Sequence, residues 1–170
     1  IEVSKYLRKL KKNVVSQKVF VAKDFTGYDA VLLMLDSLAD SSEELLTSLD
    51  KYVEEGGTLV ICGGCEPNQK ILFDAGMLSP APQLVTATGI QVHADALFGE
   101  TNFKTDGKYL TNYALPCGLT SDSKWLISSV QGIPLLWERN YGAGKFIVIN
   151  TDGYARKTGR GILIAGVSRI

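Results

Sequence analysis

The chain has 170 residues, which is the usual length of one domain with a sizeable core. It carries 18 Lys and Arg against 18 Asp and Glu, so it lacks the basic excess that marks nucleic-acid-binding domains. No apolar run reaches the ~18 residues of a membrane span, and three cysteines in a chain of this size do not identify a compartment. The first residue is Ile1 rather than a methionine, so we expect residues 1–170 to be one domain taken from a longer protein.

The first elements follow from the spacing of apolar residues. Residues 2–13 repeat apolar side chains at helical intervals and predict a charged helix with a solvated basic face. Residues 17–22 and 30–35 are short apolar runs, and each predicts a strand. Asp36 follows the second of these strands directly.

The most informative stretch runs from residue 38 to residue 66. Ser41 and Glu44 have the spacing of a capping box, and a helical apolar face follows them. Gly56 and Gly57 predict the end of this helix, because glycine adopts the left-handed C-cap conformation without steric cost. The run Thr58–Cys62 is apolar without alternation, which is typical of a strand that is covered on both faces of a parallel sheet.

The second half of the chain predicts more strands and fewer helices. A helix is expected over residues 68–75 and a strand near Ile90 and Val92, and the pattern-poor region after them is typical of a functional loop or lid. Further strands are predicted over 125–130, 133–139 and 145–150, with a glycine-rich hairpin turn at 139–144 and a closing helix over 158–170. Together these elements predict an α/β fold with a mostly parallel sheet and an antiparallel hairpin at its edge.

The passage YDAVLLMLDSLADSSEELLTSLDKYVEEGGTLVICGG resembles the class I glutamine amidotransferase-like superfamily over residues 16–66. This resemblance implies a three-layer, flavodoxin-like sheet. The passage PLLWERNYGAGKF, with Asn150 and Arg160-Gly161, is similar to an uncharacterised bacterial family in which an amidotransferase-like domain precedes a polysaccharide-deacetylase-like region. That similarity covers nearly the whole chain. It implies a role beside exported polysaccharide, in the cell envelope or outside the cell, with carbohydrate or other domains of the same protein as partners.

The sharpest enzymatic hypothesis is a nucleophilic cysteine. In the superfamily the nucleophile occupies a G-x-C-x-G elbow, and Cys62-Gly63-Gly64 matches the second half of that pattern. Val60 replaces the first glycine, and the family's His-x-Glu is absent. The one histidine, His93, lies 31 positions after Cys62, so the sequence favours a degenerate elbow with an inert cysteine over a working Cys–His pair.

Cys62 and Cys65 leave further alternatives open. They form a C-x-x-C between a strand and a helix, the position of a redox pair, although no thioredoxin-like pattern surrounds them. Cys117 and His93 would complete a Cys3His zinc set, but the second pair lacks the close spacing of such sites. We therefore expect neither a metal nor a cofactor. The sequence leaves open whether Cys62 and Cys65 form a disulfide or all three cysteines are free thiols.

The remaining candidates are polar residues that follow strands and a set of aromatic residues. Gly63 and Gly64 precede a predicted helix, where backbone amides bind phosphate. Four polar side chains are expected to converge at the carboxyl edge of the sheet as sugar or cation ligands, or as caps and solvated loop ends: Asp36, Glu66, Asn150 and Asp152. Four aromatic residues could stack on carbohydrate, or pack in the core: Trp125, Trp137, Tyr141 and Tyr154.

The sequence thus predicts a non-catalytic amidotransferase-like domain of a larger envelope or polysaccharide-processing protein, which mediates interaction or positions a glycan. The alternative is a cysteine-dependent hydrolase or amidotransferase that uses the turn containing Cys62 and Cys65.

Overall fold

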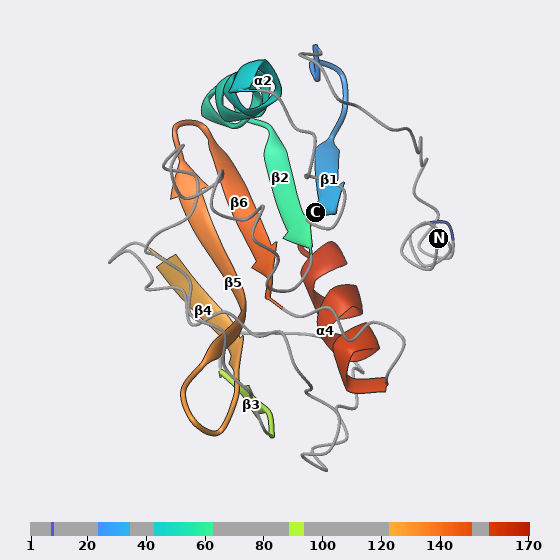
Figure 1. Cartoon of the computed structure of the whole chain (residues 1–170), viewed down its shortest axis with the longest axis vertical. Coiled ribbons are helices and arrows are strands. Elements are labelled where there is room, and N and C mark those ends of the chain that lie inside the picture. Colours follow the sequence, from blue (N-terminus) through green and yellow to red (C-terminus); the bar gives the residue numbers. More distant parts are fainter. Residues whose placement is uncertain (1–7, 9–23, 35–42, 63–88, 94–122, 151–156) are drawn as a thin grey trace.

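The computed structural model describes residue 8 and residues 24–34, 43–62, 89–93, 123–150 and 157–170 (Figure 1). Two helices and six strands lie in these ranges. In chain order they are β1 (Ala30–Met34), α2 (Glu43–Glu54), β2 (Thr58–Cys62), β3 (Gln91–Val92), β4 (Ser123–Ser128), β5 (Pro134–Tyr141), β6 (Gly144–Ile149) and α4 (Lys157–Val167). The helix predicted over residues 2–13 meets the described residues only at Arg8, which is helical. The helix predicted over 68–75, the strand over 17–22 and the capping residue Ser41 lie outside the described ranges.

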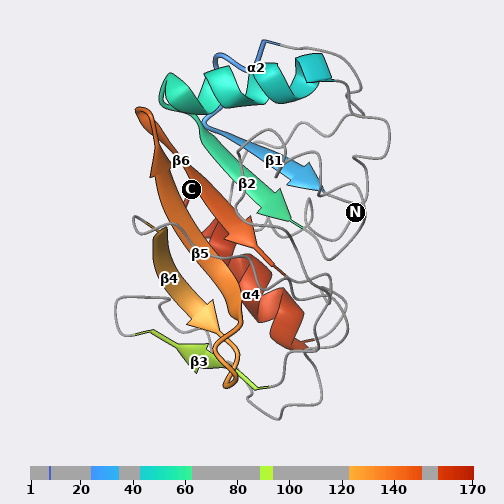
Figure 2. The same ribbon diagram turned by 60° about the vertical axis from the view of Figure 1, so that its left-hand side comes forward.

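The six strands form one mixed sheet with the order β1-β2-β6-β5-β4-β3, seen side by side in Figure 2. β1, β2 and β6 are parallel neighbours, whereas β5, β4 and β3 each run antiparallel to the strand before them in the sheet. Four strands therefore run in one direction (β1, β2, β6 and β4), and β5 and β3 run in the other. The α/β prediction and the mostly parallel direction of the strands are confirmed.

The position of the predicted hairpin differs from the expectation. β5 and β6 form it, but they lie in the middle of the sheet, and β4 and β3 extend the antiparallel part to the edge. The reason is that β6 has two partners: its apolar residues pair with β2 on one side and with β5 on the other. Local periodicity predicts each strand but contains no information about which strands become neighbours.

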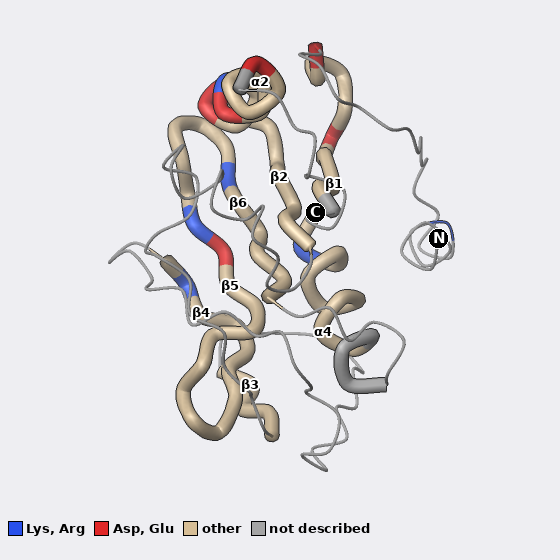
Figure 3. The backbone as a smooth tube through the Cα atoms, viewed as in Figure 1, with Lys and Arg blue, Asp and Glu red and all other residues tan. Residues whose placement is uncertain are grey.

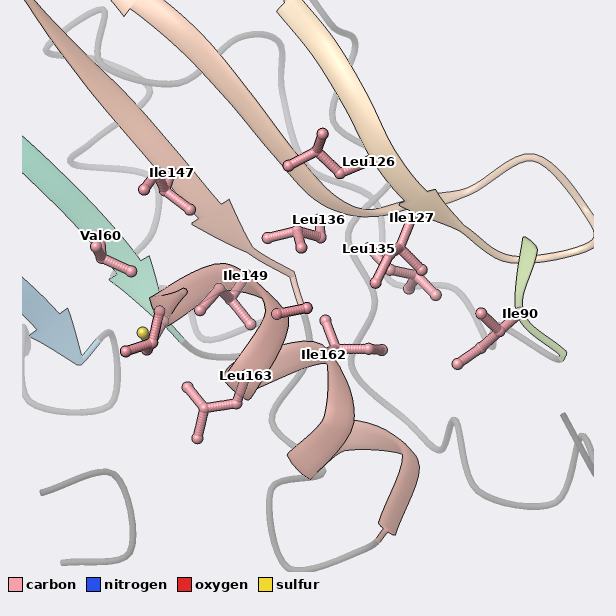
Figure 4. Close-up of a cluster of buried hydrophobic side chains, with 13 residues drawn as sticks. Val60, Ile90, Leu126, Ile127, Leu135, Leu136, Ile147, Ile149, Ile162 and Leu163 are labelled. Atoms are coloured by element: carbon pink, nitrogen blue, oxygen red, sulfur yellow. The ribbon is translucent and has the colours of Figure 1, made fainter. Parts of the chain in front are cut away.

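Side chains of β2 and β6 alternate between two hydrophobic clusters. Leu59 and Ile61 belong to one cluster, which we call the α2-side core, and Val60 and Cys62 belong to the other, the α4-side core. Since successive side chains of a strand point to opposite faces, the two cores lie on opposite faces of the sheet. Helix α2 contributes Leu45, Leu46, Leu49, Tyr52 and Val53 to the first core. Helix α4 contributes Ile162, Leu163, Ala165 and Val167 to the second, which Figure 4 shows against β2, β4, β5 and β6.

The end of α2 is fixed against the hairpin. Gly56 has a φ of 113°, and Gly57 donates its N–H to the Tyr52 carbonyl at 2.9 Å, so the glycine stop predicted from sequence is confirmed. The hairpin turn then reaches back: the Ala143 N–H donates to the Glu54 carbonyl at 2.9 Å, and the Lys145 N–H donates to the Gly57 carbonyl at 3.2 Å. This junction sets where β6 begins beside β2.

An ion pair attaches the other helix to the sheet. Arg169, just beyond α4, donates from Nη2 to Glu138 Oε1 at 2.6 Å and from Nε to Oε2 at 3.1 Å. Its carbonyl accepts a hydrogen bond of 2.8 Å from Lys145 Nζ. The C-terminal end of α4 is therefore held against β5 and β6. No helix in the described ranges is long and apolar enough to cross a membrane.

Candidate functional site

The carboxyl edge of the parallel strands is where the sequence places most candidates. Met34, Cys62 and Ile149 are partners in adjacent strands β1, β2 and β6, so this edge is continuous across them. Asn150 follows Ile149 at the same edge, one strand away from Cys62. Figure 3 shows charged residues on α2, β4, β5 and near the start of β6, whereas the carboxyl ends of β2 and β6 are uncharged.

Cys62 lies inside the apolar interior. Its exposed fraction is 0%, and it belongs to the α4-side core together with Val60, Ile149 and Leu163. A nucleophilic or redox-active thiol requires a partly exposed, electropositive surrounding that favours the thiolate, whereas apolar burial makes a thiol inert. The surroundings of Cys62 are of the second kind.

His93 does not lie near Cys62. It follows β3 at one edge of the sheet, whereas Cys62 ends β2, and three strands separate β3 from β2. At about 4.8 Å between neighbouring strands, the two residues are roughly 19 Å apart. General-base catalysis needs contact within a hydrogen bond or through one water, so the topology does not bring these two together as a catalytic pair.

Asn150 has a structural role at the end of β6. Its backbone N–H donates to the Leu135 carbonyl at 2.8 Å, and its side-chain Nδ2 donates to the Pro134 carbonyl at 2.8 Å. The side chain is 2% exposed. The amide therefore continues the β5–β6 pairing by one residue beyond the strand, which is the capping alternative that the sequence left open.

The other candidates lie outside the described residues: Asp36, Gly63, Gly64, Cys65, Glu66, Cys117, Asp152 and Tyr154. The hypotheses that use Cys65 as a nucleophile, redox partner or zinc ligand, or Gly63-Gly64 as a phosphate loop, thus stay predictions. Within the described ranges, no group of three or more His, Cys, Asp and Glu could hold a metal ion.

A polar cluster that the sequence did not predict lies where β3 meets β4. His93 Nε2 is 3.1 Å from Ser128 Oγ, and the His93 N–H donates to the Leu126 carbonyl at 3.1 Å. The imidazole also meets the indole of Trp125 edge to face, with ring centroids 6.0 Å apart and planes at 82°. Ser128 is 1% exposed, whereas His93 and Trp125 are partly exposed. No sequence signal could have found this cluster, because 35 positions separate His93 from Ser128 and only strand pairing joins them.

The aromatic candidates divide into different environments. Trp137 lies directly opposite Trp125 across β4 and β5, but it is only 4% exposed and belongs to the α2-side core. Tyr141 packs against Phe146, with centroids 5.2 Å apart, and against the guanidinium of Arg139 at 5.8 Å. Of these residues, Trp125 is the one that combines a partly exposed indole with polar neighbours.

Comparisons with known proteins extend the description of the fold. No protein-family model matches the chain, and no curated protein matches it. Among solved structures, the chain is similar to the "mmIFT52 N-terminal domain", with a TM-score of 0.62 and 11% identity over 95% of this chain and 86% of that one. It is also similar to the exo-β-1,4-mannosidase Op5Man5 from Opitutaceae bacterium strain TAV5, with a TM-score of 0.58 and 15% identity.

The coverage of the mannosidase is unequal: 98% of this chain aligns with it, but the chain spans only 28% of its length. A third similar structure is the cytoplasmic protein STM3548 from Salmonella typhimurium, with a TM-score of 0.53 and 14% identity over 80% of this chain and 70% of that one. At these identities the similarities describe a shared fold.

Proposed function

We propose that this chain is a non-catalytic, amidotransferase-like domain of a larger bacterial envelope or polysaccharide-processing protein, in which it mediates interaction with other domains or positions a glycan. The observation that carries the proposal is the environment of Cys62. The thiol has no exposed surface and lies in the α4-side core, and the one histidine of the chain lies at the β3 edge of the sheet, with three strands between it and β2.

The finer description of the fold belongs to the same proposal. A flavodoxin-like domain has helices on both faces of its sheet, and α2 and α4 pack against opposite faces here. The parallel strands β1, β2 and β6 supply the carboxyl edge at which sites of such folds lie. In our proposal this edge keeps the geometry of its relatives without their cysteine chemistry.

The polysaccharide context rests on the sequence resemblance. The mannosidase adds one supporting observation, since this fold makes up about a quarter of a larger carbohydrate-processing chain there. By analogy, the domain would sit beside a catalytic region of its own protein rather than act alone. Because one fold can host many functions, the mannosidase supports the proposed context of this domain only by analogy.

Thiol reactivity tests the proposal directly. The native protein and the protein in denaturant are incubated with a chromogenic disulfide reagent, and each labelled cysteine is identified by mass spectrometry. We expect Cys62 to react only in denaturant, because a fully buried thiol becomes accessible only through unfolding. The variant Cys62→Ser serves to assign the signal of this cysteine.

The alternative, a cysteine-dependent hydrolase or amidotransferase that uses the turn with Cys62 and Cys65, predicts the opposite result. A low-pKa nucleophile would react with the reagent in the native protein within seconds to minutes, and labelling would fall as the pH drops below its pKa. Fast native labelling of either cysteine would therefore replace our proposal by this alternative.

A further inference from the structure

We propose that the corner formed by Gln91, His93 and Trp125, on the sheet face of β3 and β4, binds a neutral pyranose unit of a glycan. This inference rests on the proposed function, of which it names the ligand class and the site. Three features of the described residues carry it. The Trp125 indole supplies an aromatic plane, which we call the aromatic wall. The His93 imidazole, nearly perpendicular to it, supplies a polar plane, which we call the polar wall, and the buried Ser128 side chain orients that imidazole.

The aromatic wall is the indole of Trp125. Its cross-strand neighbour on the same face of the sheet, Trp137, is buried in the α2-side core, whereas Trp125 retains exposed surface. An indole held in this way offers a large apolar plane at low entropic cost, because few torsions need to be fixed on binding. The apolar C–H face of a pyranose ring fits such a plane.

The polar wall is the imidazole of His93, which stands at 82° to the indole with centroids 6.0 Å apart. Gln91 precedes it by two positions on β3, so both side chains leave the strand on the same face. Gln91 is exposed. A sugar that lies flat on the indole presents its hydroxyl groups at the ring edge. A carboxamide can donate to and accept from hydroxyl groups, and imidazole Nδ1 donates or accepts according to the tautomer.

The third feature is Ser128, whose Oγ lies 3.1 Å from His93 Nε2. Ser128 is 1% exposed, so the contact holds the imidazole from the interior side and directs Nδ1 away from it. Ser128 is thus a positioning residue. Sites that bind small molecules need this support, because polar groups that are fixed before binding lose less entropy when the ligand arrives.

The charge around the corner selects the kind of glycan. The residues that form it, Gln91, His93, Trp125 and Ser128, include no carboxylate and no permanently charged cation. Lys124 neighbours Trp125 in β4 but leaves the strand on the opposite face, where it pairs with Glu138 in register. Arg139, which pairs with Ser123, leaves β5 on the same face as Trp137, and its guanidinium lies over the Tyr141 ring at 5.8 Å from the centroid. Because none of the four residues that form the corner carries a permanent charge, we assign a neutral unit.

The test is a titration of the isotope-labelled chain with three neutral hexasaccharides: β-1,4-mannohexaose, cellohexaose and chitohexaose. The indole N–H signals of Trp125 and Trp137 are followed by NMR, and Trp125→Phe assigns them. We expect saturable shifts of the Trp125 signal with a dissociation constant on the order of 1 mM for at least one of the sugars. Replacement of the indole in Trp125→Leu is expected to weaken binding by about tenfold, and loss of the imidazole in His93→Ala by about fivefold.

Controls separate a glycan site from a general structural effect. Tyr28→Leu removes an aromatic side chain that is 39% exposed elsewhere on the molecule and is expected to leave binding unchanged. Ser128→Ala is expected to change the imidazole nitrogen shifts of His93 in the unliganded protein and to weaken binding about threefold. If Ser128 had only a structural role, Ser128→Ala would leave the affinity for the sugar unchanged, whatever its effect on the nitrogen shifts of His93.

Two results would overturn the assignment: the absence of a saturable Trp125 shift with all three hexasaccharides, or binding that is as strong in Trp125→Leu as in the natural sequence. Neither result depends on the fate of Cys62. An unreactive Cys62 together with no sugar binding would retain the proposed non-catalytic domain and remove only this site. Fast labelling of a cysteine together with sugar binding at Trp125 would remove the proposed non-catalytic domain and retain this site.

Discussion

Gly144 shows how a single residue position constrains the junction between α2 and the hairpin. A Cβ atom placed there would lie 2.2 Å from the Gly57 carbonyl oxygen and 2.3 Å from the Val53 carbonyl oxygen. Both are backbone atoms, so no flexible side chain can move aside. The glycine is thus required by close approach of two backbones rather than by an unusual torsion angle.

We therefore predict that Gly144→Ala lowers the free energy of unfolding by about 2–4 kcal/mol, since the overlap must be relieved by moving β6 away from α2. The matched control is Gly27→Ala. Gly27 has a φ of 94°, and no atom lies within 4 Å of the position that its Cβ would take, so this variant measures torsional strain alone, of about 1 kcal/mol. Urea unfolding of both variants gives the comparison, and equal losses would contradict the importance of the close contact.

Tyr141 provides a prediction on pH at the same junction. The hydrogen bond of its phenol with Asp50, helped by burial and by the charges of Asp50 and Glu54, raises the pKa of Tyr141 to about 12. The folded protein binds this proton more tightly than the unfolded chain, whose tyrosine pKa is 10.0. The contribution to stability is thus complete below pH 10 and is lost as the pH rises from 10 towards 12.

A spectrophotometric titration of phenolate absorbance checks this expectation. The difference between the natural sequence and Tyr141→Phe should show one tyrosine that ionises near pH 12. Asp50→Asn should lower that pKa, because it removes the carboxylate that accepts the hydrogen bond and repels the phenolate. If Tyr141 ionises at the same pH in both backgrounds, Asp50 is not the cause of the shift.

At the scale of elements, a bidentate ion pair between Arg169 and Glu138 attaches the end of α4 to β5, and few surface ion pairs have this geometry. The Arg169 and Glu138 side chains are 26% and 16% exposed and form two parallel hydrogen bonds. Arg169 has a raised pKa, mainly through the hydrogen bonds to Glu138, so the guanidinium stays charged. Paired and partly desolvated charges of this kind are worth more than solvated pairs.

A double-mutant cycle of Arg169→Ala and Glu138→Ala should therefore give a coupling energy of about 1–3 kcal/mol. Lys51 in the last turn of α2 and Glu55 just beyond it are the internal reference, because Lys51 Nζ lies 3.8 Å from Glu55 Oε1 and the side chains are 72% and 60% exposed. Their cycle should give about 0.3–0.5 kcal/mol. Both energies come from chemical denaturation, and similar values for the two cycles would mean that burial adds nothing at α4.

How far the sequence predicts the elements depends on whether their signal is local. β2 is found at Thr58–Cys62 as predicted, and α2 and β1 lie within a residue or two of the expected ranges, because caps, glycine stops and apolar runs are contained in the segment itself. β4 begins two residues earlier than expected, at Ser123 rather than Trp125. Its pairing with Arg139 and Glu138 of β5 extends it, and that pairing is invisible in a local pattern.

The candidate site shows the same division more strongly. The sequence places Cys62 at a strand end, but it cannot show that the thiol faces the α4-side core. It identifies His93 as the single histidine, but the strand order that moves it away from Cys62 and beside Ser128 depends on long-range pairing. Residue types predict a possible chemistry, whereas the sheet topology decides which of them meet.

At the scale of the whole molecule, the two hydrophobic cores share the strands that separate them. In β6, Phe146 and Val148 face the α2-side core, while Ile147 and Ile149 face the α4-side core. β6 is also the strand at which the parallel and antiparallel halves of the sheet join. Neither core can lose its packing without disturbing the backbone that supports the other, so we expect the described sheet and helices to unfold together.

Two truncations on opposite faces test this coupling. Leu59→Ala opens the α2-side core and Ile147→Ala opens the α4-side core, and each is expected to cost about 2–5 kcal/mol because both side chains are fully buried. Tryptophan fluorescence reports the α2 side through Trp137, and far-ultraviolet circular dichroism reports the helices of both faces. If the cores are coupled through β6, both probes report the same lowered midpoint of unfolding in either variant.

The contradicting result is an Ile147→Ala variant in which the midpoint of the dichroism transition falls while that of the fluorescence transition does not change. The two faces would then unfold independently, and β6 would not act as the shared element of the fold.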